Sequence, residues 1–243
     1  MPTPVSSTST DKAPDRIAGM FDAIAPRYDF LNHLLSAGID RRWRATAIRT
    51  LGLTGVETVV DVCCGTGDVA LAASAAGARR VVGVDFAGGM LALGAGKVRT
   101  AGADGRIDMI RGDAMRLPVR DASADAVTVA FGIRNVQRPE VACLEMARVL
   151  KTGGRLAILE FSVPRLPGLT QLYQWYFTRV LPAIGQMISG HSAAYSYLPA
   201  SVGAFPPPDA FMTILRQSGF TGVRAVSLTL GIVQLYCAEK APD

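Results

Sequence analysis

Cysteine and histidine are scarce in this sequence, and their arrangement excludes several kinds of site. The chain of 243 residues contains only 4 cysteines and 2 histidines. Cys63 and Cys64 are adjacent, Cys143 and Cys237 stand alone in apolar surroundings, and no CxxC pair occurs. We therefore expect no metal site and no disulfide framework, and we expect a reducing, cytoplasmic compartment.

Long apolar runs and basic tracts are also missing. No stretch approaches the roughly 18 uninterrupted apolar residues of a membrane span, and the start MPTPVSSTSTDKAPD lacks the features of a signal peptide. The net charge of +5 comes from scattered lysines and arginines. Such a charge permits contact with nucleic acid or an anionic membrane. Without an arginine-rich tract or an NPPY-like tetrapeptide for flipped bases, we interpret it as solvated surface and expect no nucleic-acid partner.

Short segments rich in valine and isoleucine alternate with helical or loop segments through most of the chain. Five of them precede the change of pattern near residue 164, at 56–62, 78–85, 106–113, 124–131 and 153–161. This alternation predicts parallel βαβ units with helices on both faces of one sheet. Two further strands, 221–230 and 231–240, have no helix between them and predict an antiparallel hairpin at one end of that sheet.

Three segments depart from the alternation. Residues 1–14 form a Ser/Thr/Pro-rich tail that we expect to be disordered. Residues 15–51 show helical spacing of apolar residues, which we expect Pro26 to break once. Residues 164–208 are rich in aromatics and proline and predict an inserted helical cap. We expect residues 15–243 to form a single domain.

A glycine loop, DVCCGTGD, follows the first expected strand. Asp61 ends that strand, and Gly65, Thr66 and Gly67 turn into a helix that begins near Asp68. Glycine allows close approach of the backbone to a ligand. No G-K-[ST] follows, which excludes a phosphate-binding P-loop. The negative charges of Asp61 and Asp68 would repel a pyrophosphate and suit a cationic ligand carrying an amine and a sulfonium.

Two more acidic residues end the second and third expected strands. Asp85 closes VVGVD, where a carboxylate can accept both hydroxyls of a ribose. Asp113 and Ala114, in RGDAMRLP, could meet the amino group and the face of an adenine. Acids at neighbouring strand ends predict a nucleoside without phosphates, and we interpret Cys63 and Cys64 as small fillers on a buried turn.

These stretches resemble the motifs of class I S-adenosylmethionine-dependent methyltransferases. YDFLNHLLSAGIDRRW (28–43), FGIRNV (131–136), RVLKTGGRLAILEFS (148–162) and YSYLPASVGAFP (195–206) further resemble the ubiquinone/menaquinone biosynthesis C-methyltransferases. The resemblance runs from about Phe21 to Lys240. It implies a Rossmann-like, mostly parallel seven-stranded sheet, S-adenosylmethionine as methyl donor with S-adenosylhomocysteine as product, and a polyprenylated quinol ring as acceptor.

The sequence departs from the family's pattern at four places. Leu31 replaces a methionine, Asp40 replaces a histidine, and Thr152 replaces the usual proline. Ala130 stands where a serine often touches the cofactor, and we retain it as a cofactor contact without that hydroxyl. Asp40 argues against a general role for the family's histidine in this chain.

The FGIRNV stretch supplies the expected chemistry at the acceptor ring. An arginine stays protonated, so we expect Arg134 to stabilise a phenolate oxygen or acidify a water, and Asn135 to hydrogen-bond the second ring oxygen. The alternative for this pair is a surface turn anchored by an arginine–carboxylate contact. We leave Glu160 unassigned and give neither His33 nor His191 a catalytic role.

Two groups of residues are expected to enclose the acceptor. Tyr28, which we place among the catalytic residues, lies one helical turn from Asn32, a substrate contact, and together with Asp29 they would close over the site as a lid. Tyr195 and Tyr197 share a face only if that segment is extended, and would then line the acceptor pocket. Ordinary packing remains the alternative for both tyrosines.

The apolar residues of 164–189 could cover a substrate channel and touch the inner face of the plasma membrane, with Arg165 and Arg179 near anionic lipid. Core or homodimer packing is the alternative.

For function, demethylmenaquinol is the favoured acceptor. Two kinds of alternative remain. The enzyme could methylate the ubiquinone-pathway 2-polyprenyl-6-methoxy-benzoquinol or another small-molecule or sterol substrate. The chain could also be a cofactor-binding sensor or scaffold without turnover.

Overall fold

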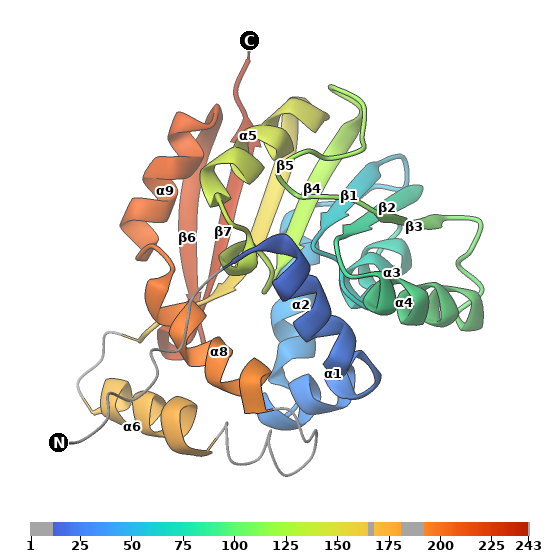
Figure 1. The fold of residues 1–243 in the computed structure, drawn as a ribbon. Helices are drawn as coiled ribbons and strands as arrows, with labels where there is room; N and C mark the ends of the chain where they lie inside the picture. Colours follow the sequence, from blue (N-terminus) through green and yellow to red (C-terminus); the bar gives the residue numbers. More distant parts are fainter. Residues whose placement is uncertain (1–11, 165–167, 181–191, 243) are drawn as a thin grey trace, which may run out of the picture.

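The computed structural model describes residues 12–164, 168–180 and 192–242, and its centre is a single twisted sheet (Figure 1). The strands of the sheet lie in the order β3-β2-β1-β4-β5-β7-β6. Their bounds are β1 (Thr58–Val62), β2 (Arg80–Asp85), β3 (Ile107–Arg111), β4 (Ala124–Ala130), β5 (Leu150–Phe161), β6 (Phe220–Leu228) and β7 (Val233–Lys240). All seven strands fall on segments expected from the sequence.

The pairing of the strands confirms the mostly parallel sheet and its antiparallel end. The pairs β1–β2, β2–β3, β1–β4 and β4–β5 are parallel. β7 is antiparallel to both β5 and β6 and lies between them. The chain order reverses between β1 and β4, and the edge at the carboxyl ends of these strands is where ligands bind in open α/β sheets.

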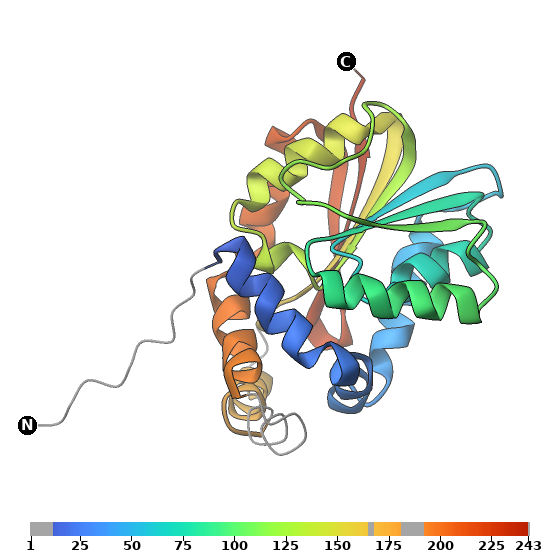
Figure 2. The same cartoon turned by 45° about the vertical axis from the view of Figure 1, so that its right-hand side comes forward.

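Helices cover both faces of the sheet. Their bounds are α1 (Pro14–Leu35), α2 (Ile39–Thr50), α3 (Asp68–Ala75), α4 (Gly88–Thr100), α5 (Pro139–Val149), α6 (Leu169–Trp175), α8 (Ser192–Ala204) and α9 (Pro208–Gln217). One buried core contains residues of α5 and α9, and a second contains residues of α2, α3 and α4. Figure 2 shows α1 running between α4 and α8, and it contacts both helices.

The expected break at Pro26 is wrong, because α1 continues through this residue. A proline inside a helix costs free energy by removing a hydrogen bond. Here the neighbouring Ile24 and Ala25 are buried against other elements, which offsets that cost. The helix ends instead before Gly38, whose φ is 74°. The tail expected at 1–14 falls on residues outside the described part, apart from Lys12, Ala13 and the start of α1.

Most of the described part of segment 164–208 is helical. It contains α6, the single π-helical turn η2 (Tyr176–Val180) and α8, whereas residues 165–167 and 181–191 lie outside the described part, as do Arg165 and His191. Because Tyr195 and Tyr197 lie on a helix, they do not share a face, and the condition for the pair to act together is not met.

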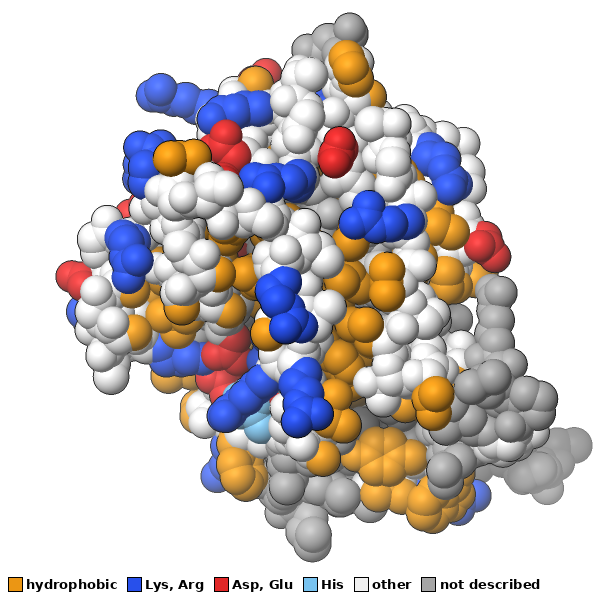
Figure 3. All heavy atoms as spheres, turned by 180° about the vertical axis from the view of Figure 1, so that it is seen from behind, with side chains coloured by type: hydrophobic (Ala, Val, Ile, Leu, Met, Phe, Trp, Pro, Cys, Tyr) orange, Lys and Arg blue, Asp and Glu red, His pale blue; other side chains and the backbone are white. Residues whose placement is uncertain are grey.

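The surface shows no continuous basic stripe on the face drawn in Figure 3, where lysine and arginine side chains are spread among neutral ones. Hydrophobic side chains gather on its lower part. Within the described residues, no helix combines the length and the apolar character that a membrane crossing requires.

Candidate active site

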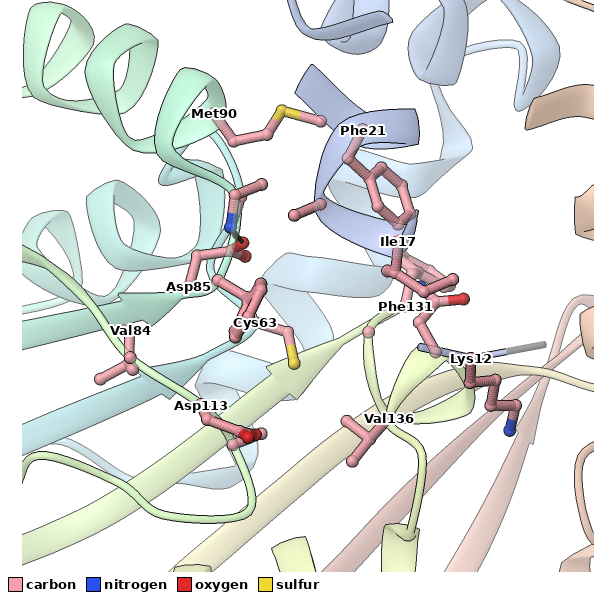
Figure 4. Close-up of a pocket in the computed structure, with 18 of the residues that line it drawn as sticks. Lys12, Ile17, Phe21, Cys63, Val84, Asp85, Met90, Asp113, Phe131 and Val136 are labelled. Atoms are coloured by element: carbon pink, nitrogen blue, oxygen red, sulfur yellow. Dashed lines mark hydrogen bonds between the residues drawn. The ribbon is translucent and has the colours of Figure 1, made fainter. Parts of the chain in front are cut away.

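An open cavity lies at the carboxyl ends of the strands, beside the point where the strand order reverses. Residues after β1, β2, β3 and β4 form one side, and α1 crosses the other (Figure 4). The cavity therefore occupies the place that the strand-end acids predict.

The glycine loop reaches the cavity through left-handed backbone. The φ angles of Cys63, Gly65 and Gly67 are 55°, 54° and 80°. A Cβ added to Gly83, on the neighbouring strand, would lie 3.0 Å from the Cys64 sulfur. Burial raises the pKa of both thiols well above the usual value, so they stay protonated. These features support the interpretation of the two cysteines as close-packed fillers.

Asp85 lies on the cavity wall with its carboxylate held by backbone donors. The amide N–H of Gly65 donates to Oδ2 over 2.7 Å, and that of Ala87 donates to Oδ1 over 2.9 Å. Burial raises the pKa of Asp85, although these hydrogen bonds lower it in part. A carboxylate has about four acceptor sites, so acceptor capacity remains for hydroxyl groups of a ligand.

Asp61 lies behind the loop and is not among the residues that line the cavity. Its Oδ1 accepts a hydrogen bond of 2.9 Å from the Thr128 hydroxyl, whereas its Oδ2 is buried and has no partner of normal geometry among the described residues. Burial raises the pKa of Asp61 to about 7. A buried acceptor without a donor costs free energy, and the amino group of a cationic ligand would relieve that cost.

Asp113 and Ala114 both line the cavity, as predicted. The Met115 N–H donates to Asp113 Oδ1 over 2.8 Å, which fixes the carboxylate at the turn after β3. Apolar side chains complete this half of the wall: Ile17, Phe21, Val84, Phe86, Ala87 and Met90. In the sequence, these residues carry no signal that separates them from an ordinary apolar core.

Thr66, Gly67 and Asp68 face other elements. The Thr66 hydroxyl donates to Asp29 Oδ1 on α1 over 2.6 Å. Lys97, on α4, donates to Asp29 Oδ2 over 2.8 Å and also pairs with Asp68. Arg44 pairs with Asp68 at 3.1 Å. Lys97 is shared with Asp29 and Arg44 with Asp40, and Asp68 is not among the residues that line the cavity. The expectation that Asp68 contributes to an acidic rim is therefore wrong.

The FGIRNV stretch forms the opposite end of the cavity. Ala130, Phe131, Gly132 and Asn135 all line it. The φ of Phe131 is 60°, and a Cβ on Gly132 would lie only 2.3 Å from the Cys63 Cβ. The Asn135 side chain, on the short 3-10 helix η1 (Ile133–Asn135), has a buried Oδ1 without a partner among the described residues. That oxygen is available to a donor on a bound molecule.

Arg134 is buried beside the cavity and is not among its lining residues. Its Nη1 pairs with Glu160 Oε1 at 2.7 Å, its Nε donates to the Ser201 hydroxyl over 3.3 Å, and its guanidinium lies 5.4 Å from the centre of the Phe161 ring. Glu160 is fully buried. Sequence analysis left Glu160 unassigned, although its position at the end of β5 was the available signal.

The residues expected to enclose the acceptor divide into two groups. Tyr28 lines the cavity and packs edge-on against Phe21, with 5.9 Å between ring centres. Tyr197 is buried in α8 and is not among the lining residues. The side chains of Asn32 and Tyr195 lie outside the described part of the structure, so their predicted contacts stay predictions.

Metal ligation finds no support in the described residues, where no cluster of three His, Cys, Asp or Glu side chains could hold an ion.

Solved structures with low sequence identity share the fold. The chain matches a [4+2]-cyclase, SpnF, with a TM-score of 0.70 at 19% identity, covering 95% of this chain and 98% of that one. It matches a SAM-dependent methyltransferase from Aquifex aeolicus with a TM-score of 0.61 at 17% identity, covering 93% and 98%.

Curated proteins match at much higher identity. The ubiquinone/menaquinone biosynthesis C-methyltransferase UbiE of Geobacter sp. (strain M21) is 48% identical over 228 residues, which cover 93% of this chain and 97% of that protein. A demethylmenaquinone methyltransferase of Bacteroides fragilis (strain YCH46) is 41% identical over 230 residues, covering 94% of both. The model of the ubiE/COQ5 methyltransferase family matches residues 9–240. The chain therefore belongs to the ubiE/COQ5 methyltransferase family.

Proposed function

We propose that this chain transfers the methyl group of S-adenosylmethionine to a ring carbon of a polyprenylated quinol, with demethylmenaquinol as the preferred acceptor. The observation that carries the proposal is one cavity with two unlike ends. Asp85 and Asp113 lie on the nucleoside side, and the unsatisfied amide oxygen of Asn135 lies near the other end. Curated relatives at 41–51% identity are named for this chemistry.

The residues on the nucleoside side fit the methyl donor. Asp85 offers two oxygens to the ribose hydroxyls, and Asp113 with Ala114 borders the place for the adenine. When bound, the donor supplies a methyl group activated by a positively charged sulfur that leaves as a neutral thioether.

The chain's main task is then to align the ring carbon with that methyl group and to support charge on the ring oxygens. Asn135 is placed to accept a hydrogen bond from one ring hydroxyl. Arg134 adds positive charge behind it, and the contacts of Arg134 with Glu160 and Ser201 hold the η1 turn in position. The apolar face of α1 covers the cavity and limits the access of water.

The test uses purified protein, isotopically labelled S-adenosylmethionine and each of the two demethylated quinols, with the product identified by mass. We expect one added methyl group, with demethylmenaquinol consumed faster than 2-polyprenyl-6-methoxy-benzoquinol. The reverse preference would favour the ubiquinone branch. If neither quinol gains a methyl group while the donor binds in calorimetry, the proposed function falls, and another small-molecule substrate or a sensor role takes its place.

Asn135→Ala is the variant that separates chemistry from folding. We expect it to lower methyl transfer at least tenfold, the effect of about 1.4 kcal/mol, while leaving donor binding unchanged. Arg134→Ala is a poorer choice because it leaves the fully buried Glu160 without its cation, which destabilises a protein by about 3–5 kcal/mol. Wild-type turnover in Asn135→Ala would remove this residue from the acceptor site.

A further inference from the structure

The charges around the cavity are divided between its two sides. Asp85 and Asp113 are the acids of its wall, and Lys12 is the sole basic side chain among the described residues that line it. Figure 4 shows Lys12 next to Val136, across the cavity from Asp85. Sequence analysis placed Lys12 in a disordered tail and gave it no role. The structure instead places it at the end of the cavity formed by η1.

Lys12 is partly buried and lies within electrostatic range of three charged groups. These are Glu160 at the end of β5, Arg134 on η1, and Glu140 in the first turn of α5. Glu160 is already paired with Arg134 at 2.7 Å, and no ion pair between Lys12 and either glutamate is formed. The four-carbon stem of a lysine is flexible, so its ammonium can turn toward an anion that enters this end of the cavity.

The proposed reaction needs a cation at this end. A quinol carbon becomes a strong nucleophile when a ring hydroxyl loses its proton, and the resulting oxygen anion must be stabilised. The guanidinium of Arg134 is largely occupied by Glu160, Ser201 and the Phe131 carbonyl. Lys12 lines the same end of the cavity, and among the described residues its ammonium forms no such ion pair or hydrogen bond.

We propose that Lys12 is a residue of the methyl-acceptor site whose ammonium stabilises the ionised hydroxyl of the quinol. The proposal rests on the proposed function and names one group that the acceptor meets. The hydroxyl proton passes to water, the ring carbon forms its bond to the methyl carbon, and the sulfur–methyl bond breaks. The ring carbon then loses its proton through water, and the oxygen regains one, so that one proton is released for each methyl group transferred.

The pKa of Lys12 sets the highest pH at which its ammonium can stabilise the ionised hydroxyl. Burial lowers the pKa of Lys12; Glu160 and Glu140 act in the opposite direction, and Arg134 lowers the pKa further. The net direction is down, so the ammonium loses its proton at a lower pH than a free lysine does. A rate that depends on this charge should therefore decline again on the alkaline side.

The experiment compares pH–rate profiles of the full chain with a short-tailed, water-soluble demethylmenaquinol, which avoids any dependence on vesicles. A cation within about 4–6 Å lowers the pKa of an acid by roughly 1–3 units. We therefore expect Lys12→Met to move the acidic limb of kcat/KM up by about one pH unit, and to lower the rate about tenfold near neutral pH. Lys12→Arg should keep the wild-type acidic limb, since its charge is retained.

Lys151→Met is the matched control, because Lys151 pairs with Asp125 at the far end of the sheet and is about half exposed. Its profile should match the wild type. Lys12→Gln serves as a second neutral variant if Lys12→Met folds poorly. Donor affinity, measured by calorimetry, should stay unchanged in every variant.

Four results would overturn the assignment. An unshifted acidic limb in both neutral variants would show that Lys12 does not act on the quinol hydroxyl. Equal defects in Lys12→Arg and Lys12→Met would indicate a structural role, and a parallel loss of donor affinity would place Lys12 with the donor instead. Wild-type protein that methylates neither quinol would overturn the proposed function and this inference together, whereas the first three results leave the function standing.

Discussion

At the scale of single residues, the cavity wall is built from backbone that most side chains avoid. Cys63 and Phe131 both have left-handed φ angles, 55° and 60°, although neither is glycine. Each such residue costs about 1–2 kcal/mol. The two segments meet where Gly132 passes beside Cys63. This close approach brings the glycine loop and the FGIRNV turn to the same cavity.

Gly132→Ala should damage this meeting point. The added Cβ would lie 2.3 Å from the Cys63 Cβ, and overpacking of this kind costs about 1–3 kcal/mol or more. We expect a lower midpoint in urea unfolding and weaker donor binding. Gly96→Ala, in α4 with open space around it, should instead be neutral or stabilising by about 0.5–1 kcal/mol. If both variants had the same unfolding midpoint and donor affinity, the backbone around Gly132 would be able to shift and accommodate the added Cβ.

Glu57 should make the stability of the protein depend on pH in the acidic range. Burial alone would raise its pKa, but hydrogen bonds, first those from the backbone and side chain of Thr54, lower it to about 2. Because the folded pKa lies below the unfolded value of about 4.3, stabilisation is complete above pH 4–5 and is lost as the pH falls toward 2. The full effect is about 3 kcal/mol.

The measurement for Glu57 is urea unfolding of the wild type and Glu57→Gln between pH 3 and pH 7. The wild type should be more stable at neutral pH, and the difference should shrink steadily below pH 4.5. A difference that stays constant with pH would mean that the carboxylate charge has no part in it.

Strand-end acids were predictable as site residues because a strand-end position is a property of the local sequence. Asp85, Asp113 and Ala114 therefore line the cavity as expected. Thr66 and Asp68 follow the same loop, yet they face Asp29, Arg44 and Lys97. These partners come from distant parts of the chain, and the sequence holds no local signal for such pairings. Glu160 lies near the end of β5, so its strand-end position was visible in the sequence, but its pairing with Arg134 was not.

At the scale of elements, α1 matters most because it closes the cavity and is held to the domain by a few polar contacts. The Asp22 carboxylate accepts a hydrogen bond of 2.8 Å from the Gly89 N–H at the start of α4. Asp29 accepts from both Thr66 and Lys97. The chain thus fastens the same helix to the glycine loop and to α4. The strength of these contacts should govern how easily the cavity opens.

Asp29→Asn should weaken the closure of α1. Ion pairs with partial exposure are worth up to about 1 kcal/mol, so we expect donor affinity to fall roughly fivefold, with a small change in overall stability. Asp108 forms an exposed ion pair with Arg80, with 2.7 Å between the two side chains, and this pair lies away from the cavity. Asp108→Asn should therefore leave donor affinity unchanged. In a double-mutant cycle, Asp29→Asn and Lys97→Met should not be additive; additive effects would show that the pair does not act through this contact.

The strands and the parallel or antiparallel sense of their pairing were more predictable than the helices at the ends of the sheet. Short Val/Ile-rich segments identify buried strands, and parallel pairing follows from the helices between them. The continuity of α1 through Pro26 depends on the burial of Ile24 and Ala25 against other elements. Propensity alone cannot anticipate that packing.

At the scale of the whole molecule, several large apolar side chains remain exposed around one satellite cluster. Buried Ile24 and Tyr173 join residues of α1, η2, α8 and the start of β7 in this cluster. Nearby in the chain, Phe30, Trp175 and Leu230 are 61%, 57% and 67% exposed. Exposed apolar side chains that gather on one surface mark contacts with proteins or membranes. We propose that this end of the molecule touches an anionic membrane surface, with the exposed Arg179 nearby in the chain.

Sedimentation with anionic vesicles at low salt tests the proposed membrane contact. We expect the wild type to pellet, and Trp175→Ser and Leu230→Ser each to weaken binding about tenfold, the effect of losing roughly 1.4 kcal/mol of apolar burial. Val56→Ser is the control, because Val56 is 69% exposed before β1, at the other end of the strands. Equal loss in the control, or no pelleting of the wild type, would favour a homodimer contact or plain solvent exposure.

The place of β7 between β5 and β6 has a consequence for how the protein emerges from a ribosome. β6 is made first, yet its partner in the described sheet is β7. While residues up to 228 are outside the exit tunnel, the nucleoside half of the sheet can already assemble, but β6 has no edge to join and β5 is open on one side. The nascent chain at that stage would present two unpaired strands, and a chaperone that shields such edges should bind it most strongly just before β7 appears.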